Sequence, residues 1–274
     1  MPLTGDTSVM AIRVMTTNVL SPDHAGWGRR RPVLQAEFAR FSPDVIAVQE
    51  VASTDFLDPQ YAVAWHSRKS AGGVGAALAS RWPLGEVSEI DLHVTDRTDD
   101  FPWAAAVVAE VLAPVPFLFV HHKPSWPVPY AYERELQAVR CARHVEERLA
   151  GRDMHVVLAG DFDAAPDSSS IRFWTGRQSL DGTSVAYQDA WEAVHPGDAG
   201  HTFSPLNPLV RAGDMPLEPG RRIDYIMVRC RAHGPTLQVA DCFLVFNKPV
   251  DGVWATDHFG LVADLDGSAK PIGA

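Results

Sequence analysis

The chain of 274 residues carries a formal net charge of −10, with 46% hydrophobic and 21% charged residues. This composition is typical of a globular protein, and at this length it favours one large domain. A negative average field disfavours tight, sequence-independent binding to nucleic acid, although a bound cation or a local basic patch would reverse the sign at one site.

Targeting and cysteine patterns exclude further classes of protein. The chain does not begin with a basic segment followed by an apolar run, and no stretch approaches the roughly 18 apolar residues of a membrane span, so we expect a cytoplasmic protein without a transmembrane segment. The three cysteines, Cys141, Cys230 and Cys242, show no CxxC spacing. They predict reduced structural thiols rather than a disulfide framework or a zinc site.

Short runs of β-branched and apolar residues predict strands in chain order. They span residues 11–19, 44–51, 74–80, 104–112, 117–121, 154–159, 223–228 and 260–264. Helical periodicity predicts helices over 31–41 and 132–149, and the stretch 181–219, rich in Gly and Pro, predicts a long irregular connection. We expect a single layered α/β domain over 11–266, with a flexible N-terminus at 1–10 and a C-terminal tail at 267–274.

Polar side chains fall repeatedly at the ends of these predicted strands. They are Asn18, Glu50, His121 and His122, Asp161 and Asp163, Asp224, and Asp257 and His258. One such residue alone is typical of a turn or a helix cap. Six segments of this kind in one chain predict a shared pocket of acids around imidazoles, provided that the strand ends converge.

A cation site is the first part of the chemistry that this mixture indicates. Mg²⁺ and Mn²⁺ take oxygen ligands from one or two carboxylates and keep several waters, which leaves room for a phosphate oxygen. Glu50 and Asp257, with Asn18 as a neutral oxygen, are the candidate ligands.

Acid, base and charge stabilisation are the second part. The transition state of phosphate-ester hydrolysis gathers negative charge on its oxygens, and a protonated histidine stabilises that charge. His121 and His258 are candidates for this role, while Asp161 is the candidate base toward the attacking water. Asp224 is the candidate partner that orients His258 and keeps it charged.

The ordered motifs resemble those of the endonuclease/exonuclease/phosphatase superfamily. They are Thr17-Asn18-Val19, Gln49-Glu50-Val51, Ser80-Arg81-Trp82-Pro83-Leu84, Gly160-Asp161-Phe162-Asp163, Ile223-Asp224-Tyr225 and Asp257-His258-Phe259. The resemblance spans roughly residues 11 to 265. It implies a DNase I-like four-layer α/β sandwich, in which two packed, mostly antiparallel β-sheets are flanked by helices and the active site lies at one edge.

The resemblance also implies roles for individual residues. Asn18, Glu50 and Asp257 would be associated with the metal, Asp161 would position or activate water, and the paired His258 and Asp224 would contact the phosphate. The run His121-His122-Lys123-Pro124 is similar to the family's histidine segment after the middle strand. That comparison favours His121, and a one-residue shift would select His122 instead.

Two departures from the family pattern make the expected site less positive. Asp163 stands where the family usually has Asn, and the family's frequent basic phosphate contact near Pro102-Trp103 is absent. Three hypotheses cover Asp163: it shares a proton with Asp161, it helps to hold a second metal ion, or it caps a turn. Lys123, Arg97 and Arg221 are candidate replacements for the missing cation, although a solvated surface charge is the more common role of such residues.

The sequence therefore predicts a Mg²⁺- or Mn²⁺-dependent hydrolase of phosphate mono- or diesters, acting on a small molecule, a nucleotide or a lipid head group. A DNA or RNA endonuclease or exonuclease is the alternative within the same chemistry. A non-catalytic binding protein on the same fold is the alternative from another class, and the retention of Glu50, Asp161, Asp224, Asp257 and His258 argues against it. Family likeness indicates the reaction more firmly than the substrate.

Overall fold

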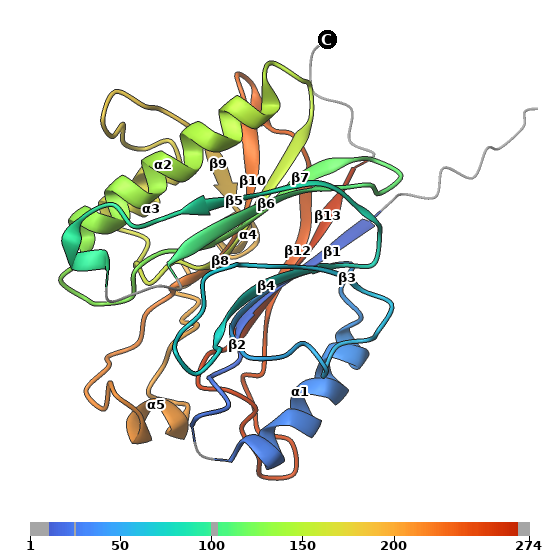
Figure 1. The fold of residues 1–274 in the computed structure, drawn as a ribbon, viewed down its shortest axis with the longest axis vertical. Coiled ribbons are helices and arrows are strands. Elements are labelled where there is room, and N and C mark those ends of the chain that lie inside the picture. The colour runs from blue at the N-terminus through green and yellow to red at the C-terminus, as the bar shows by residue number, and fades with distance from the viewer. Residues whose placement is uncertain (1–10, 25, 100–103, 268–274) are drawn as a thin grey trace, which may run out of the picture.

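A computed structural model describes residues 11–24, 26–99 and 104–267. Two β-sheets pack face to face, and helices cover their outer faces, which gives the four-layer α/β sandwich that the sequence predicts (Figure 1). The predicted flexible N-terminus and, apart from residue 267, the predicted tail lie outside the described residues, as does Trp103.

The first sheet has six strands in the order β12-β13-β1-β2-β4-β3. Their bounds are β1 (Ala11–Asn18), β2 (Val45–Val51), β3 (Ala62–Trp65), β4 (Gly75–Ser80), β12 (Gln238–Val245) and β13 (Gly260–Asp266). The pair β1 and β2 is parallel, with Asn18 opposite Gln49, and the other neighbours are antiparallel.

The second sheet follows the order β11-β10-β8-β7-β6-β5, and β9 also pairs with β10. Its strands are β5 (Leu84–Asp91), β6 (Ala105–Val111), β7 (Phe117–Lys123), β8 (His155–Asp161), β9 (Tyr187–Asp189), β10 (Asp224–Arg231) and β11 (Gly234–Pro235). Here the parallel pair is β7 and β8, while Asp224 at the start of β10 lies opposite Asp161 at the end of β8. Each sheet thus has one parallel pair at its centre, and the site is built at the carboxyl ends of these two pairs.

The helices are fewer and lie outside the sheets. They are α1 (Trp27–Phe41), α2 (Ala131–Leu149), α3 (Ser169–Trp174), α4 (Ala190–Val194) and α5 (Pro208–Ala212), with a 3₁₀ turn at Asp96–Thr98. Among the described residues, no helix is long and apolar enough to cross a membrane.

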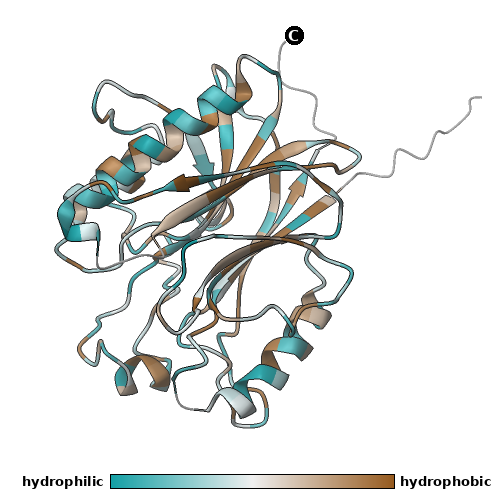
Figure 2. Cartoon of the chain, in the orientation of Figure 1, coloured by the Kyte–Doolittle hydropathy of each residue, from teal (hydrophilic) through white to brown (hydrophobic). Residues whose placement is uncertain are grey.

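Strand alternation explains why the sheets are apolar on both faces (Figure 2). Val45 and Ala47 of β2 point into the core between the sheets, whereas Ile46 and Val48 point outward and pack under α1. The second sheet is arranged in the same way: its outer face packs against Ala138, Ala142 and Val145 of α2, together with residues of α3. Near-continuous apolar runs are the expected sequence signature of strands that are buried on both sides.

Two expectations about secondary structure are corrected. The sequence patterns do not predict β3, β5 and β12: β3 is short, β5 is largely exposed and polar, and Asp241 interrupts the apolar run of β12 next to a bulge. The stretch 181–219 is not wholly irregular, since it contains β9, α4 and α5. Asp189 and Asn207 cap the two helices by accepting hydrogen bonds from backbone N–H groups of their first turns, which allows short helices to form in a Gly- and Pro-rich segment.

Candidate active site

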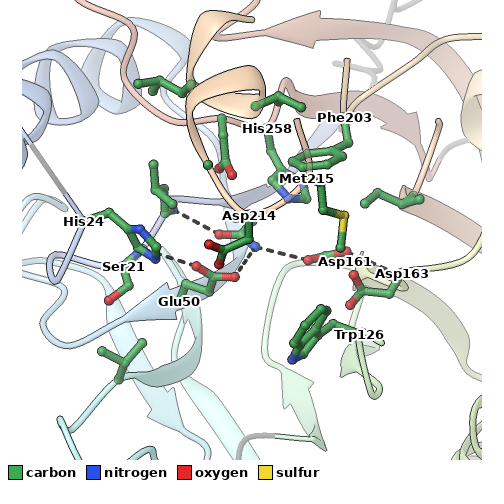
Figure 3. Close-up of a pocket in the computed structure, with 18 of the residues that line it drawn as sticks. Ser21, His24, Glu50, Trp126, Asp161, Asp163, Phe203, Asp214, Met215 and His258 are labelled. Atoms are coloured by element: carbon green, nitrogen blue, oxygen red, sulfur yellow. Dashed lines mark hydrogen bonds between the residues drawn. The ribbon is translucent and has the colours of Figure 1, made fainter. Parts of the chain in front are cut away.

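A cavity of about 550 Å³ opens at the carboxyl ends of the two parallel strand pairs (Figure 3). Seven of the sequence-predicted residues contribute to this end of the sandwich. Asn18, Glu50, Asp161, Asp163, Asp257 and His258 line the cavity directly, and Asp224 lies behind His258. Strands from both sheets therefore supply the site.

Asn18, the last residue of β1, links the two sheets through its side chain. Its Nδ2 donates to Glu50 Oε1 at 2.9 Å and to Asp161 Oδ2 at 3.1 Å, while its Oδ1 accepts from the backbone N–H of Leu20 at 3.0 Å. The amide is 2% exposed. Asn18 thus fixes the positions of two carboxylates from different sheets relative to each other.

Glu50 and Asp257 form a pair of like charges on one wall of the cavity. Burial raises the pKa of Asp257, and the Glu50 carboxylate raises it further. Glu50 also has a positive φ of 58°, a conformation that side-chain-bearing residues rarely adopt and that functional sites often contain. Two carboxylates facing one cavity form a donor set of the kind that binds a hard divalent cation.

Asp161, Asp163 and Lys123 form a buried ion-paired cluster on the opposite side. The Nζ of Lys123 lies 2.8 Å from Asp161 Oδ2 and also contacts Asp163 Oδ2. Burial raises the pKa of Asp161, but Lys123 and His258 outweigh that effect, so the pKa lies below its usual value and the carboxylate stays charged. Burial and the neighbouring Asp161 instead raise the pKa of Asp163 to about 6.

The backbone at this cluster explains two features of the Gly-Asp-Phe-Asp motif. A Cβ on Gly160 would lie 2.0 Å from the carbonyl oxygen of His122 on β7, so only glycine permits the close approach of β7 and β8 there. Asp163 has a φ of 51°, and its N–H donates to Asp161 Oδ1 at 3.2 Å. The turn after β8 thus directs both carboxylates toward Lys123.

His258 and Asp224 form the second buried pair. The Nδ1 of His258 lies 2.9 Å from Asp224 Oδ2, and the backbone N–H of Asp224 donates to Thr202 Oγ1 at 3.2 Å. The ring of Phe203 packs against the imidazole, with centroids 4.8 Å apart. Burial lowers the pKa of His258, but Asp224 and Asp161 outweigh it and raise the pKa to about 10, so the imidazole is protonated at neutral pH.

Ligand atoms of Asp161, Asp224 and His258 lie within 4.8 Å of one another, a spacing that would suit a metal ion. A protonated imidazole has two N–H donors and no free lone pair for a metal. Because His258 is charged and already bonded to Asp224, this cluster is better described as an acid–imidazolium–acid arrangement. Glu50 and Asp257 remain the better candidates for direct metal ligands.

The two neighbouring histidines, His121 and His122, lie elsewhere. His121 is fully buried between the sheets, where its Nε2 is 2.7 Å from Gln49 Nε2 and its ring packs against His66. His122 points to the other face of the sheet and packs between Phe162 and Trp174, where burial lowers its pKa to about 3. Neither residue lines the cavity.

Lys123 is the residue that the sequence interpretation undervalued. It is 3% exposed, lines the cavity and pairs with two acids, whereas a solvated surface charge was the preferred reading. Arg221 also lines the cavity and pairs with Glu218, and Arg97 pairs with Glu133 instead. The signal that could have identified Lys123 was Asp163 itself, because a second buried carboxylate requires a nearby cation.

Comparisons with known proteins agree with this geometry. Residues 15–258 match the model of the endonuclease/exonuclease/phosphatase family. A comparison with curated proteins finds no match.

Solved structures share the fold at low sequence identity. Truncated Caenorhabditis elegans TDP2 superposes with a TM-score of 0.72 at 17% identity, covering 93% of this chain and 97% of that chain. The human Nocturnin catalytic domain with a bound sulfate gives 0.70 at 17% identity, covering 93% and 94%. D. rerio TDP2 complexed with a single-strand DNA product gives 0.70 at 18% identity, covering 93% and 98%.

Proposed function

We propose, from the premise that the chain belongs to the endonuclease/exonuclease/phosphatase family, that it is a hydrolase of phosphate mono- or diesters that uses Mg²⁺ or Mn²⁺. One observation carries the proposal. Carboxylates from both sheets and a protonated imidazole converge on one cavity at the carboxyl ends of the central strands. This is the combination that phosphate-ester hydrolysis requires.

Glu50 and Asp257 are the proposed metal ligands. Glu50 raises the pKa of Asp257 through like-charge repulsion, and a divalent cation held by these two carboxylates would relieve that repulsion. When bound, such a cation withdraws electron density from a phosphoryl oxygen and neutralises developing charge. Asn18 has its amide oxygen on Leu20 and its amide nitrogen on Glu50, so its proposed role is to orient the ligand Glu50.

Asp161 is the proposed base. Its ionised carboxylate faces the cavity and accepts a proton as the water oxygen bonds to phosphorus. The bond between phosphorus and the ester oxygen then breaks, and the departing oxygen takes a proton from solvent. Lys123 and Asn18 both donate to Oδ2 of Asp161 and the N–H of Asp163 donates to Oδ1, which together fix the orientation of the carboxylate.

His258 is the proposed stabiliser of charge on the phosphate. Its Nδ1–H is held by Asp224, which leaves Nε2–H as a donor on the cavity side. Negative charge increases on the phosphoryl oxygens in the transition state, so a fixed positive charge on this ring would stabilise that state more than the ground state. Asp224 acts through His258 and is a positioning residue.

A small molecule, a nucleotide or a lipid head group is the proposed substrate. The chain's net charge of −10 and the acids of the cavity oppose a long polyanion. A nuclease activity is the second candidate, and the observation in its favour is the shared fold with the D. rerio TDP2 that was solved with a single-strand DNA product.

A screen for hydrolysis tests the proposal. The purified chain, with Mg²⁺ or Mn²⁺, is assayed for phosphate release or diester cleavage on nucleotides, sugar phosphates, phospholipids, plasmid DNA and RNA. Hydrolysis that Asp161→Asn abolishes, with the variant still folded by circular dichroism, supports the proposed function. Binding of phosphate compounds without turnover of any would instead favour a non-catalytic protein on this fold.

A further inference from the structure

The cavity combines a charged floor with an apolar wall. Glu50, Asp161, Asp163, Asp257 and His258 form the floor, whereas the wall comes from α5 and the loops around it. Phe203, Val210 and Ile223 form a small buried cluster, and Met215 packs on it while remaining partly exposed. These residues are separate from the larger cores of the sandwich, so the cluster supports the cavity wall rather than the sheets.

Two side chains present this apolar surface to the space above the acids. In the view of Figure 3, the carboxylates of Asp161 and Asp163 lie between Met215 and Trp126. Trp126 lines the cavity and is 37% exposed, a large fraction for an indole. The Sδ of Met215 is 3.5 Å from Nη2 of Arg221, which holds the thioether in place. A polarisable thioether and a partly exposed indole in one cavity lining offer an adaptable contact surface to an apolar group.

The charges around the cavity disfavour a second phosphate on the substrate. Among the described residues, each Lys or Arg that lines the cavity is paired with an acid: Lys123 with Asp161 and Asp163, and Arg221 with Glu218. The imidazolium of His258 is paired with Asp224. The rim adds two exposed acids, Asp23 and Asp214. A second phosphate on the substrate would therefore meet acids and find its cationic partners already engaged.

We propose that this cavity selects an ester of a single phosphate whose neighbouring group is an uncharged apolar ring or alkyl chain in contact with Met215 and Trp126. The inference rests on the proposed function, because it places the reacting phosphate over the charged floor. This proposal implies that nucleoside polyphosphates and long nucleic acids are poor substrates. The cavity volume of about 550 Å³ is in the range that encloses a ligand of this size.

The test compares esters whose leaving groups have similar basicity, so that intrinsic reactivity does not set the result. They are methyl, benzyl and cyclohexylmethyl phosphate, and benzyl phosphate with a para-phosphonate, each as the monoester and as the methyl diester. We expect kcat/KM for the benzyl ester to exceed that for the methyl ester at least about tenfold, since burial of apolar surface is realised only with the ring or chain. The cyclohexylmethyl ester separates a general apolar preference from an aromatic one.

Three variants test which residues cause the preference for the benzyl ester and the exclusion of a second negative charge. Met215→Ala should lower the ratio of benzyl to methyl kcat/KM, mainly through KM. Leu217→Ala is the matched control, because Leu217 is two residues away, 94% exposed and outside the cavity lining; it should leave the ratio unchanged. Asp214→Lys should raise kcat/KM for the para-phosphonate ester relative to the plain benzyl ester.

The outcomes distinguish this inference from the proposed function. Hydrolysis of all the esters without a benzyl preference, or a preference for the para-phosphonate in the parent chain, would overturn the inference and leave the phosphoesterase function standing. If neither these esters nor any substrate of the hydrolysis screen is hydrolysed with either metal, the proposed function fails. Calorimetric binding of benzylphosphonate and methylphosphonate then decides the inference: tighter binding of the benzyl compound that Met215→Ala weakens supports it, and equal binding overturns it.

Discussion

Lys123 Nζ lies 2.8 Å from a carboxylate oxygen of Asp161 and also bonds to the carboxylate of Asp163, with all three side chains buried. Two like charges this close resist joint ionisation unless a cation or a shared proton intervenes. The cation is supplied by the chain itself. Lys123 thus balances the charge that Asp163 adds at a position where the family usually has a neutral asparagine.

Lys123→Met should destabilise the fold by about 3–5 kcal/mol, because it removes the cation that pairs with two buried carboxylates. The double variant Lys123→Met/Asp163→Asn should regain part of this loss, with a coupling of about 1–3 kcal/mol, since it removes the second charge as well. Urea unfolding of the parent, both single variants and the double variant measures the cycle. Lys248→Met, at an exposed site, is the control. Strict additivity would show that the pair is not energetically coupled.

Glu50→Gln should weaken the binding of Mg²⁺ or Mn²⁺ at least about tenfold, because it removes a charged oxygen ligand and keeps the side-chain volume. Isothermal titration calorimetry with the metal alone measures this affinity without any substrate. EDTA should abolish turnover in the parent chain. Glu147→Gln, on the exposed face of α2, is the matched control. Equal metal affinity of Glu50→Gln and the parent would remove Glu50 from the cation site.

His258→Ala and Asp224→Asn should each lower kcat by about 10²–10⁴-fold, and the double variant should be little slower than His258→Ala alone. The reason is that Asp224 acts only through the imidazole that it orients, at 2.9 Å from Nδ1. Steady-state kinetics on whichever ester the screen identifies gives the values, with the exposed His233→Ala as control. A double variant that lost the full product of both effects would show that the two residues act independently.

The strand ends that carry the acids could be predicted because apolar runs mark buried strands and a polar residue after each run marks its end. Asn18, Glu50, Asp161 and His258 were found in this way, and the structure brings them to one cavity. Strands with polar, exposed faces, such as β5, give no such signal. Composition also could not show that residues 208–212 form a helix at the cavity, because the packing of Val210 on Ile223 is a tertiary contact that the local cap Asn207 does not report.

The positions of His121 and His122 within β7 could not be predicted from the sequence. The apolar run predicts a strand that stops at His121, which would place an imidazole at the cavity, but β7 continues to Lys123. Successive residues of a strand point to opposite faces, and each residue adds about 3.3 Å along it. His121 therefore lies on the same face as Lys123 but deeper, between the sheets, and His122 lies on the other face. Register within a strand is decided by packing, which a single sequence does not report.

His66 follows β3 and is fully buried beside His121. Neither of its ring nitrogens has a hydrogen-bond partner among the described residues, and burial lowers its pKa from 6.5 to about 3. In the unfolded chain this imidazole takes up a proton below about pH 6.5, whereas in the folded chain it stays neutral until about pH 3. The unfolded state therefore binds the extra proton, so this residue makes the folded chain lose stability as pH falls from 6.5 toward 3.

His66→Phe should accordingly reduce the loss in the free energy of unfolding between pH 7 and pH 5 by up to about 2 kcal/mol, as one proton with these pKa values requires. Urea unfolding at pH 5, 6 and 7 measures the change. His66→Gln separates titration from packing: it also removes the titrating group, so it should flatten the pH dependence as well, but it retains a buried polar group and should be less stable than His66→Phe at every pH. If the parent chain and both variants lost the same free energy between pH 7 and pH 5, the imidazole of His66 would have to be accessible to protons in the folded state.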